Sequence, residues 1–240
     1  IFNSNKYIIN QVEINVKLTR NTNQFFLMHG STDKYAYEIT HAEMLFRKVL
    51  IDDEVVQAHN AALEVSPAMY PFTRGIVKPF TIPSSLASYN IDNVNQGILP
   101  SRVVIGQIDS DAFNGIAEKN PYNFKHNNLT SISLKVGGKD VAYYSPLNFD
   151  FKKSQYIRGL NMMYENIDGP INVIGNSITR ADYSGGNTLF VWDLTPDLDS
   201  SHNFHLLKSG NLSIHLQWAE NLATPITLVV YLEFDNILQI

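Results

Sequence analysis

The stretch that decides the fold is residues 99–138, LPSRVVIGQIDSDAFNGIAEKNPYNFKHNNLTSISLKVGG. It opens with the apolar run Val-Val-Ile and closes with an alternating run at 132–136, which two glycines follow. Both runs have the length and the β-branched content of β-strands, and Gly137-Gly138 is typical of a two-residue hairpin turn. A polar loop of residues 109–128 joins the two predicted strands. Because a loop of this length is usually functional, we expect it to be a binding or assembly element.

Two further strands near the C-terminus have the clearest patterns in the chain. Residues 212–218 and 226–234 place an apolar side chain at every second position. A period of two predicts strands with one face against a hydrophobic core. We therefore expect four large side chains in the core: Leu216, Trp218, Leu232 and Phe234.

The remaining pattern predicts more strands and two short helices. We expect strands at 12–20, 25–28, 37–51, 72–82, 139–143 and 188–194, helices at 52–65 and 154–165, and loops at 84–97 and 172–186. Since strands do not alternate regularly with helices, a parallel α/β sheet is disfavoured. The sequence predicts an all-β protein, an eight-stranded antiparallel jelly-roll sandwich that forms a single domain over residues 1–240.

Composition excludes several classes of protein. Of the 240 residues 44% are hydrophobic and 17% charged, which suits a folded chain with a sizeable core. The formal net charge is −5, and without a basic stripe we expect no direct binding to nucleic acid. The apolar runs have strand length, short of the roughly 20 residues that span a bilayer. There are no cysteines, so disulfides and thiolate ligands are excluded.

Two pairs of carboxylates are the first candidates for chemistry. Asp109 and Asp111 stand near a predicted strand end, and Asp197 and Asp199 follow a proline. Paired carboxylates can hold a divalent cation or act as general acid and base. Aspartates at such places more often bond to the backbone of their own turn, and we favour that interpretation.

The histidines and the glycine motifs offer no stronger candidate. His202 and His205 form the only close histidine pair, and two nitrogen ligands do not complete a zinc site. The hydrolase motif Gly-x-Ser-x-Gly, the phosphate-binding loop and the dinucleotide fingerprint are all absent from the sequence. We therefore expect no enzyme activity, no catalytic residue, no metal and no cofactor.

The aromatic residues of the 109–128 loop could stack on a sugar or a base. We favour a structural role, because an ordered loop of this length must bury something to offset its loss of conformational entropy. We expect Phe113, Tyr122 and Phe124 to anchor the loop on its own domain or on a neighbouring subunit, with Asn114 among the polar residues that satisfy backbone groups.

The same stretch resembles a known family. The runs at 99–106, 111–115 and 119–124 are similar to a pattern of the hexon-like major capsid proteins of Polinton/Maverick elements and adintoviruses. Further similar runs stand at 193–198 and 231–236, and the resemblance covers nearly the whole chain.

The resemblance implies a virion protein without catalytic activity. The family's subunits are double jelly rolls that form trimers of pseudo-hexagonal outline, and the trimers tile an icosahedral shell. This chain resembles the second, C-terminal roll, with residues 10–18 as its first strand. The implied partners are other copies of the protein, the capsid lattice, and penton or minor capsid proteins. The implied location is the virion capsid, assembled inside the host cell, in the nucleus or the cytoplasm.

Two other functions stay open at this point. A carbohydrate- or receptor-binding module shares the jelly-roll architecture, and fold alone does not separate it from a shell subunit. An enzyme of the cupin type would need clustered His and Glu residues on neighbouring strands, whereas the histidines here fall on separate segments.

Overall fold

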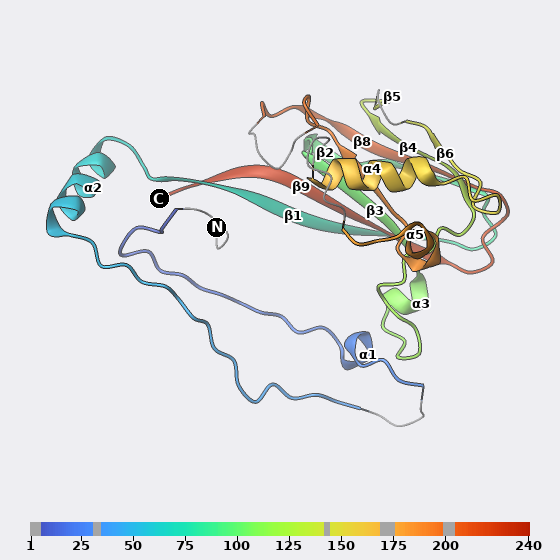
Figure 1. The fold of residues 1–240 in the computed structure, drawn as a ribbon, viewed down its shortest axis with the longest axis horizontal. Helices are drawn as coiled ribbons and strands as arrows, with labels where there is room; N and C mark the ends of the chain where they lie inside the picture. Colours follow the sequence, from blue (N-terminus) through green and yellow to red (C-terminus); the bar gives the residue numbers. More distant parts are fainter. Residues whose placement is uncertain (1–5, 31–34, 142–144, 169–175, 199–204) are drawn as a thin grey trace.

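The computed structural model describes residues 6–30, 35–141, 145–168, 176–198 and 205–240 (Figure 1). Two antiparallel β-sheets share one hydrophobic core. The first sheet has the strand order β1 (Met69–Ile82), β9 (Ile226–Gln239), β3 (Arg102–Asp109), β7 (Leu189–Asp193). The second has the order β2 (Ser88–Ile98), β8 (Ser209–Trp218), β4 (Leu129–Val136), β5 (Lys139–Asp140), with β6 (Leu147–Asn148) also paired to β4.

The strand order confirms the predicted jelly roll. Along the chain the long strands alternate between the sheets: β1, β3, β7 and β9 lie in the first, and β2, β4 and β8 in the second. Every pairing between named strands is antiparallel. The described residues contain nine strands, and two short ones, β5 and β6, both pair with β4. The turn between β4 and β5 is the predicted one, with positive φ at Gly137 and Gly138.

The core lies between the sheets and follows the alternation of the last two strands. From Leu212 to Trp218 in β8 and from Ile226 to Phe234 in β9, every second side chain is buried. Leu216, Trp218, Leu232 and Phe234 are among them. The indole Nε1 of Trp218 donates a hydrogen bond to Oε1 of the buried Gln107 on β3, at 3.0 Å. This bond joins the two sheets across the core.

Five helices occur in the described residues: α1 (Asn23–Phe26), α2 (Asp53–Val65), α3 (Ser110–Phe113), α4 (Ile157–Asp168) and α5 (Arg180–Gly186). The two predicted helices correspond to α2 and α4, and α4 packs on β7. Asp52 caps α2, and its side chain accepts a hydrogen bond from the N–H of Asp53 at 3.0 Å.

Two predicted strands, at 12–20 and 37–51, are not formed. Both segments pair with no strand among the described residues, and most of their side chains are exposed. They belong to what we call the arm, residues 6–30 and 35–51, which runs outside the two sheets (Figure 1). The first strand of the sandwich is therefore β1 and not residues 10–18. An alternating pattern shows that a segment can bury one face, but not which partner covers it.

Three other segments also differ from prediction. The strand expected at 25–28 is replaced by α1, which ends at Phe26, and the loop expected at 84–97 contains most of β2. Strand β2 is largely polar and has an irregular register between Ile91 and Asn95, so its period of two is broken. The loop expected at 172–186 contains α5, within its described part.

Removing the indole of Trp218 should destabilise the sandwich. We expect Trp218→Ala to lower the free energy of unfolding by about 3–5 kcal/mol, because it leaves a cavity between the sheets. Trp218→Phe should cost about 0.5–1.5 kcal/mol, since Gln107 Oε1 loses one donor and keeps the other, Asn127 Nδ2, at 3.3 Å. Urea denaturation measures both. The exposed neighbour Gln217 gives the control Gln217→Ala, which should stay within about 0.5 kcal/mol of wild type. A wild-type midpoint for Trp218→Ala would contradict this assignment.

Candidate functional site

The loop between β3 and β4, residues 110–128, is held at its start by the end of the first sheet. The N–H of Ser110 donates to the carbonyl of Pro225 at 3.2 Å, and its hydroxyl is hydrogen-bonded to that of Thr227 at 3.0 Å. Both Ser110 and Thr227 are buried. The loop therefore leaves the sandwich from a fixed point beside β9, and α3 forms its first turn.

Phe124 fixes the second half of the loop to the first sheet. Its N–H donates to the carbonyl of Gly186 at 2.7 Å, and its carbonyl accepts from the N–H of Thr188 at 3.0 Å. Its ring lies over Gly106 of β3, where an added Cβ would come within 2.5 Å of Phe124 Cδ1 and 2.9 Å of Leu189 Cδ2. The half-buried ring thus fills the space that the missing side chain of Gly106 leaves.

The aspartates of the loop form ion pairs, which corrects the interpretation that they cap a turn. Asp109 precedes α3 but makes no side-chain cap. Its Oδ2 lies 2.8 Å from Lys125 Nζ and 3.9 Å from Lys119 Nζ, and Asp111 Oδ2 lies 3.0 Å from Lys119 Nζ. The hydrogen bond to Asp111 raises the pKa of Lys119 above its ordinary value. Two lysines thus offset the charge of the two carboxylates.

Of the remaining predicted loop residues, Tyr122 contacts the arm. Tyr122 is exposed, and its ring meets that of Phe25 edge to face at a centroid distance of 6.2 Å. The N–H of His29 donates to the carbonyl of Ala117 at 3.0 Å, so the arm and the loop are also joined through backbone. Phe113 is half-buried and Asn114 is exposed; the N–H of Asn114 donates to the carbonyl of Ser110 at 2.9 Å.

His126 connects the loop to an aromatic stack. Its ring lies flat on Phe151, with a centroid distance of 4.0 Å and an interplanar angle of 4°. Phe151 in turn stacks on Tyr156, and Tyr156 on Tyr183 of α5. Nδ1 of His126 accepts a hydrogen bond from the N–H of Asn128 at 2.9 Å, and burial lowers the pKa of the imidazole. Sequence reasoning did not single out His126, because its partners are distant in the chain.

The second aspartate pair and the histidine pair are only partly described. Nε2 of His205 lies 3.1 Å from Oδ1 of Asp197, whereas Asp199 and His202 lie outside the described residues. In the part of the chain that the structure describes, no three His, Asp or Glu side chains lie close enough together to hold a metal ion. Helices long and apolar enough to cross a membrane are likewise not found there.

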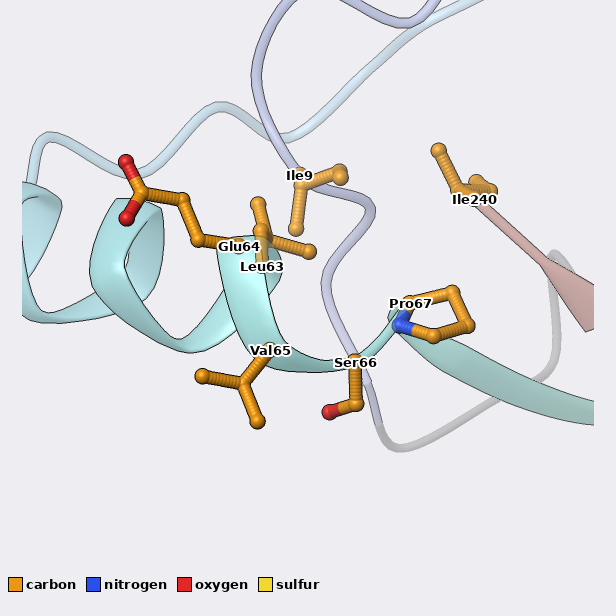
Figure 2. Close-up of a pocket in the computed structure, with 7 residues that line it drawn as sticks. All are labelled: Ile9, Leu63, Glu64, Val65, Ser66, Pro67 and Ile240. Carbon is orange, nitrogen blue, oxygen red and sulfur yellow. The ribbon is translucent and has the colours of Figure 1, made fainter.

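Two grooves lie away from the loop. One, of about 490 Å³, is lined largely by apolar side chains at one end of the sandwich, among them Leu99, Leu194 and Leu207. The other, of about 480 Å³, lies where the arm meets the end of α2 (Figure 2). Ile9 of the arm and Leu63 of α2 line it together with Ile240.

Comparison with known proteins gives one relative by sequence and several by structure. An uncharacterised protein of Caenorhabditis elegans is 24% identical to this chain in an alignment 246 residues long. The alignment includes 99% of this chain. The chain spans 58% of the length of that relative. No family model matches the chain.

Among solved structures, the Faustovirus major capsid protein is 10% identical, with a TM-score of 0.46 over 77% of this chain and 36% of that one. The PBCV-1 protein VP54, as fitted into a reconstruction of the virophage Sputnik, is 12% identical, with a TM-score of 0.46 over 77% of this chain and 52% of that one. The fold assignment rests on the strand order described above.

A side chain at position 106 should disturb the loop through Phe124. We expect Gly106→Ala to lower the free energy of unfolding by about 1–3 kcal/mol, because the new methyl group overpacks against the ring. In a Phe124→Ala background the same substitution should cost less, since most of the obstacle is gone. Urea denaturation of the two single variants and the double variant measures the coupling. Additive losses would show that the ring and the glycine are independent.

Acidification should weaken the fold through His126. Burial places the folded pKa of this group below its unfolded value of about 6.5. The unfolded chain then binds more protons, so this contribution is full above the unfolded pKa and is lost as pH falls through it toward the folded pKa. We expect His126→Gln to lose less thermal stability than wild type between about pH 7.5 and pH 5. His59→Gln, at an exposed site on α2, serves as control and should follow wild type. Equal losses for His126→Gln and wild type would contradict this.

Proposed function

We propose that this chain is the C-terminal jelly roll of a hexon-like major capsid subunit. In this proposal the subunit has two jelly rolls, forms trimers of pseudo-hexagonal outline, and builds an icosahedral shell. The chain would act as structural material and not as an enzyme.

The jelly-roll strand order is the observation that carries the proposal. The sheets β1-β9-β3-β7 and β2-β8-β4-β5 form the architecture that the capsid-like sequence pattern implies. Two of the sequence runs that carry the resemblance also contact each other in the structure. Residues 99–106 lead into and form much of β3, and 119–124 end in the ring that covers Gly106.

The surface of the chain also suits an assembling subunit. Besides the arm, large apolar side chains are exposed on the sandwich, including Val77, Ile98 and Ile237 on its strands. Leu206 and Leu207 are exposed as well, and both line the groove at the end of the sandwich. Exposed apolar surface that gathers around a groove favours contact with other protein.

The proposed partners follow from the same assignment. They are other copies of the subunit within a trimer, neighbouring trimers in the capsid lattice, and penton or minor capsid proteins. The net charge of −5 gives no support to a direct contact with nucleic acid. The proposed location is the virion capsid, after assembly in the nucleus or cytoplasm of the host cell. Membership of the Polinton/Maverick and adintovirus group is part of the proposal and rests on the sequence motifs.

Assembly of the full polypeptide tests this function. We expect native mass spectrometry and light scattering to find trimers, and electron micrographs to show shell-like particles at higher concentration. A stable monomer at high concentration would count against a capsid role. A specific signal on a glycan array, in the absence of trimers, would favour the carbohydrate- or receptor-binding module instead.

A further inference from the structure

The arm combines a strand-like sequence with a position in which it cannot act as a strand. Its first segment, residues 12–20, alternates without interruption between apolar side chains and polar ones up to Leu18. The second segment, 36–51, has apolar side chains on one face at first and on both faces near its end, in Met-Leu-Phe at 44–46 and Val-Leu-Ile at 49–51. The first pattern is typical of a strand with one covered face, and the second of a strand covered on both.

These apolar side chains face solvent. Leu18 is 89% exposed, Leu45 is 88% exposed and Leu50 is fully exposed. Val16 and Phe46 are also exposed. A folded protein rarely leaves so many large apolar side chains uncovered along one segment unless another surface binds there.

The backbone of the arm is also without strand partners. Residues 13–20 and 36–51 make no backbone-to-backbone hydrogen bond in the described structure. The arm is held elsewhere. Its first residues contact β1, where Tyr70 donates to the carbonyl of Tyr7 and accepts from the N–H of Ile9, each at 3.1 Å. Its middle contacts the β3–β4 loop through Phe25 and His29. The first strand-like segment lies between these two attachments, and the second lies between the loop contact and α2 (Figure 1).

The missing partner must bring several strands of its own. Two strands alone form at best a marginally stable pair in water. The end of the second segment needs cover on both faces, so a further layer is required as well. Arms from two copies of this chain would supply one layer of four strands and nothing to cover its second face. A complete β-domain meets the requirement, whereas a second copy of the arm does not.

We propose that residues 12–20 and 36–51 are the last two strands of a separate β-domain, whose other strands come from a segment of the same polypeptide that precedes Ile1. The length of the relative supports this occupant. Although 99% of this chain is matched, the match covers 58% of the relative, which leaves enough sequence for a domain of that kind. Consecutive elements of a chain are usually adjacent in space, so two strands at the start of this chain pair most simply with what comes before them.

This inference rests on the proposed double-roll subunit for the identity of the neighbouring domain, but it does not need capsid assembly. It moves the boundary between the two domains to α2. The groove between Ile9, Leu63 and Ile240 then lies at the junction of the domains (Figure 2).

Hydrogen–deuterium exchange on the full polypeptide and on the 240-residue chain tests the strand assignment. In the 240-residue chain the amides of 13–20 and 36–51 should exchange as fast as an unfolded peptide. In the full polypeptide their exchange should slow by about 100-fold or more, because strand pairing protects them. Fast exchange in both proteins would overturn the proposal. Slow exchange in the 240-residue chain together with a dimeric mass would overturn it too, and would assign the strands to a second copy.

Substitutions on the two faces of the first segment provide a matched control. Val16→Asp should abolish protection of 13–20 in the full polypeptide, whereas Asn15→Asp, on the polar face, should keep it. Protection of β8 and β9 should not change in either variant, because the sandwich does not contain the arm. Equal protection in both variants would overturn the assignment of faces.

The same samples separate this inference from the proposed function. A full polypeptide with a protected arm that stays monomeric would refute capsid assembly and leave the domain boundary standing. Trimers with an unprotected arm would support capsid assembly and refute the domain boundary. A full-length gene that encodes no β-domain upstream of Ile1 would refute the domain boundary directly.

Discussion

The contact between the ring of Phe124 and the bare backbone of Gly106 is the constraint on which much of this structure depends. Strand β3 lies between β9 and β7, and Gly106 pairs with both neighbours, with Val229 on one side and Leu189 on the other. At this point strand β3 has no side chain of its own. The ring of Phe124 takes that place, and the backbone of Phe124 bonds to the segment that leads from α5 into β7. One aromatic residue thus holds the long loop and the edge strand of the sheet together.

The rest of the loop is positioned by this contact and by the ion pairs near its start. Asp109 lies at the end of β3 and is only slightly exposed, so two lysine ammonium groups within 4 Å offset the cost of its partial burial. The outer part of the loop is then free to present Tyr122 and the backbone of Ala117 to the arm. The loop is therefore a connection between the sandwich and the arm.

The parts of the fold that sequence could predict are those in which burial follows the strand period. Strands β8 and β9 show this clearly, since residues 212–218 and 226–234 bury every second side chain against the same core. Strand β2 was missed because an irregular register interrupts its alternation and few of its side chains are buried. Helix α5 was missed although Thr179 and Asp182 form a capping box, a local signal that the sequence does contain. The contact of Phe25 with Tyr122 carries no local signal, because the two residues are brought together only by the fold.

The pairing of the first and last strands of the sandwich has a consequence for how such a protein can arise. Ala68, just before β1, and Ile240, just after β9, exchange two backbone hydrogen bonds of 2.9 and 3.0 Å. The chain therefore enters and leaves the roll at the same place. A module of this kind can be copied in tandem within one gene, or moved into another, without threading the chain through an existing core. Two rolls on one polypeptide then need only a short connection between them, and α2 lies where such a connection would run (Figure 1).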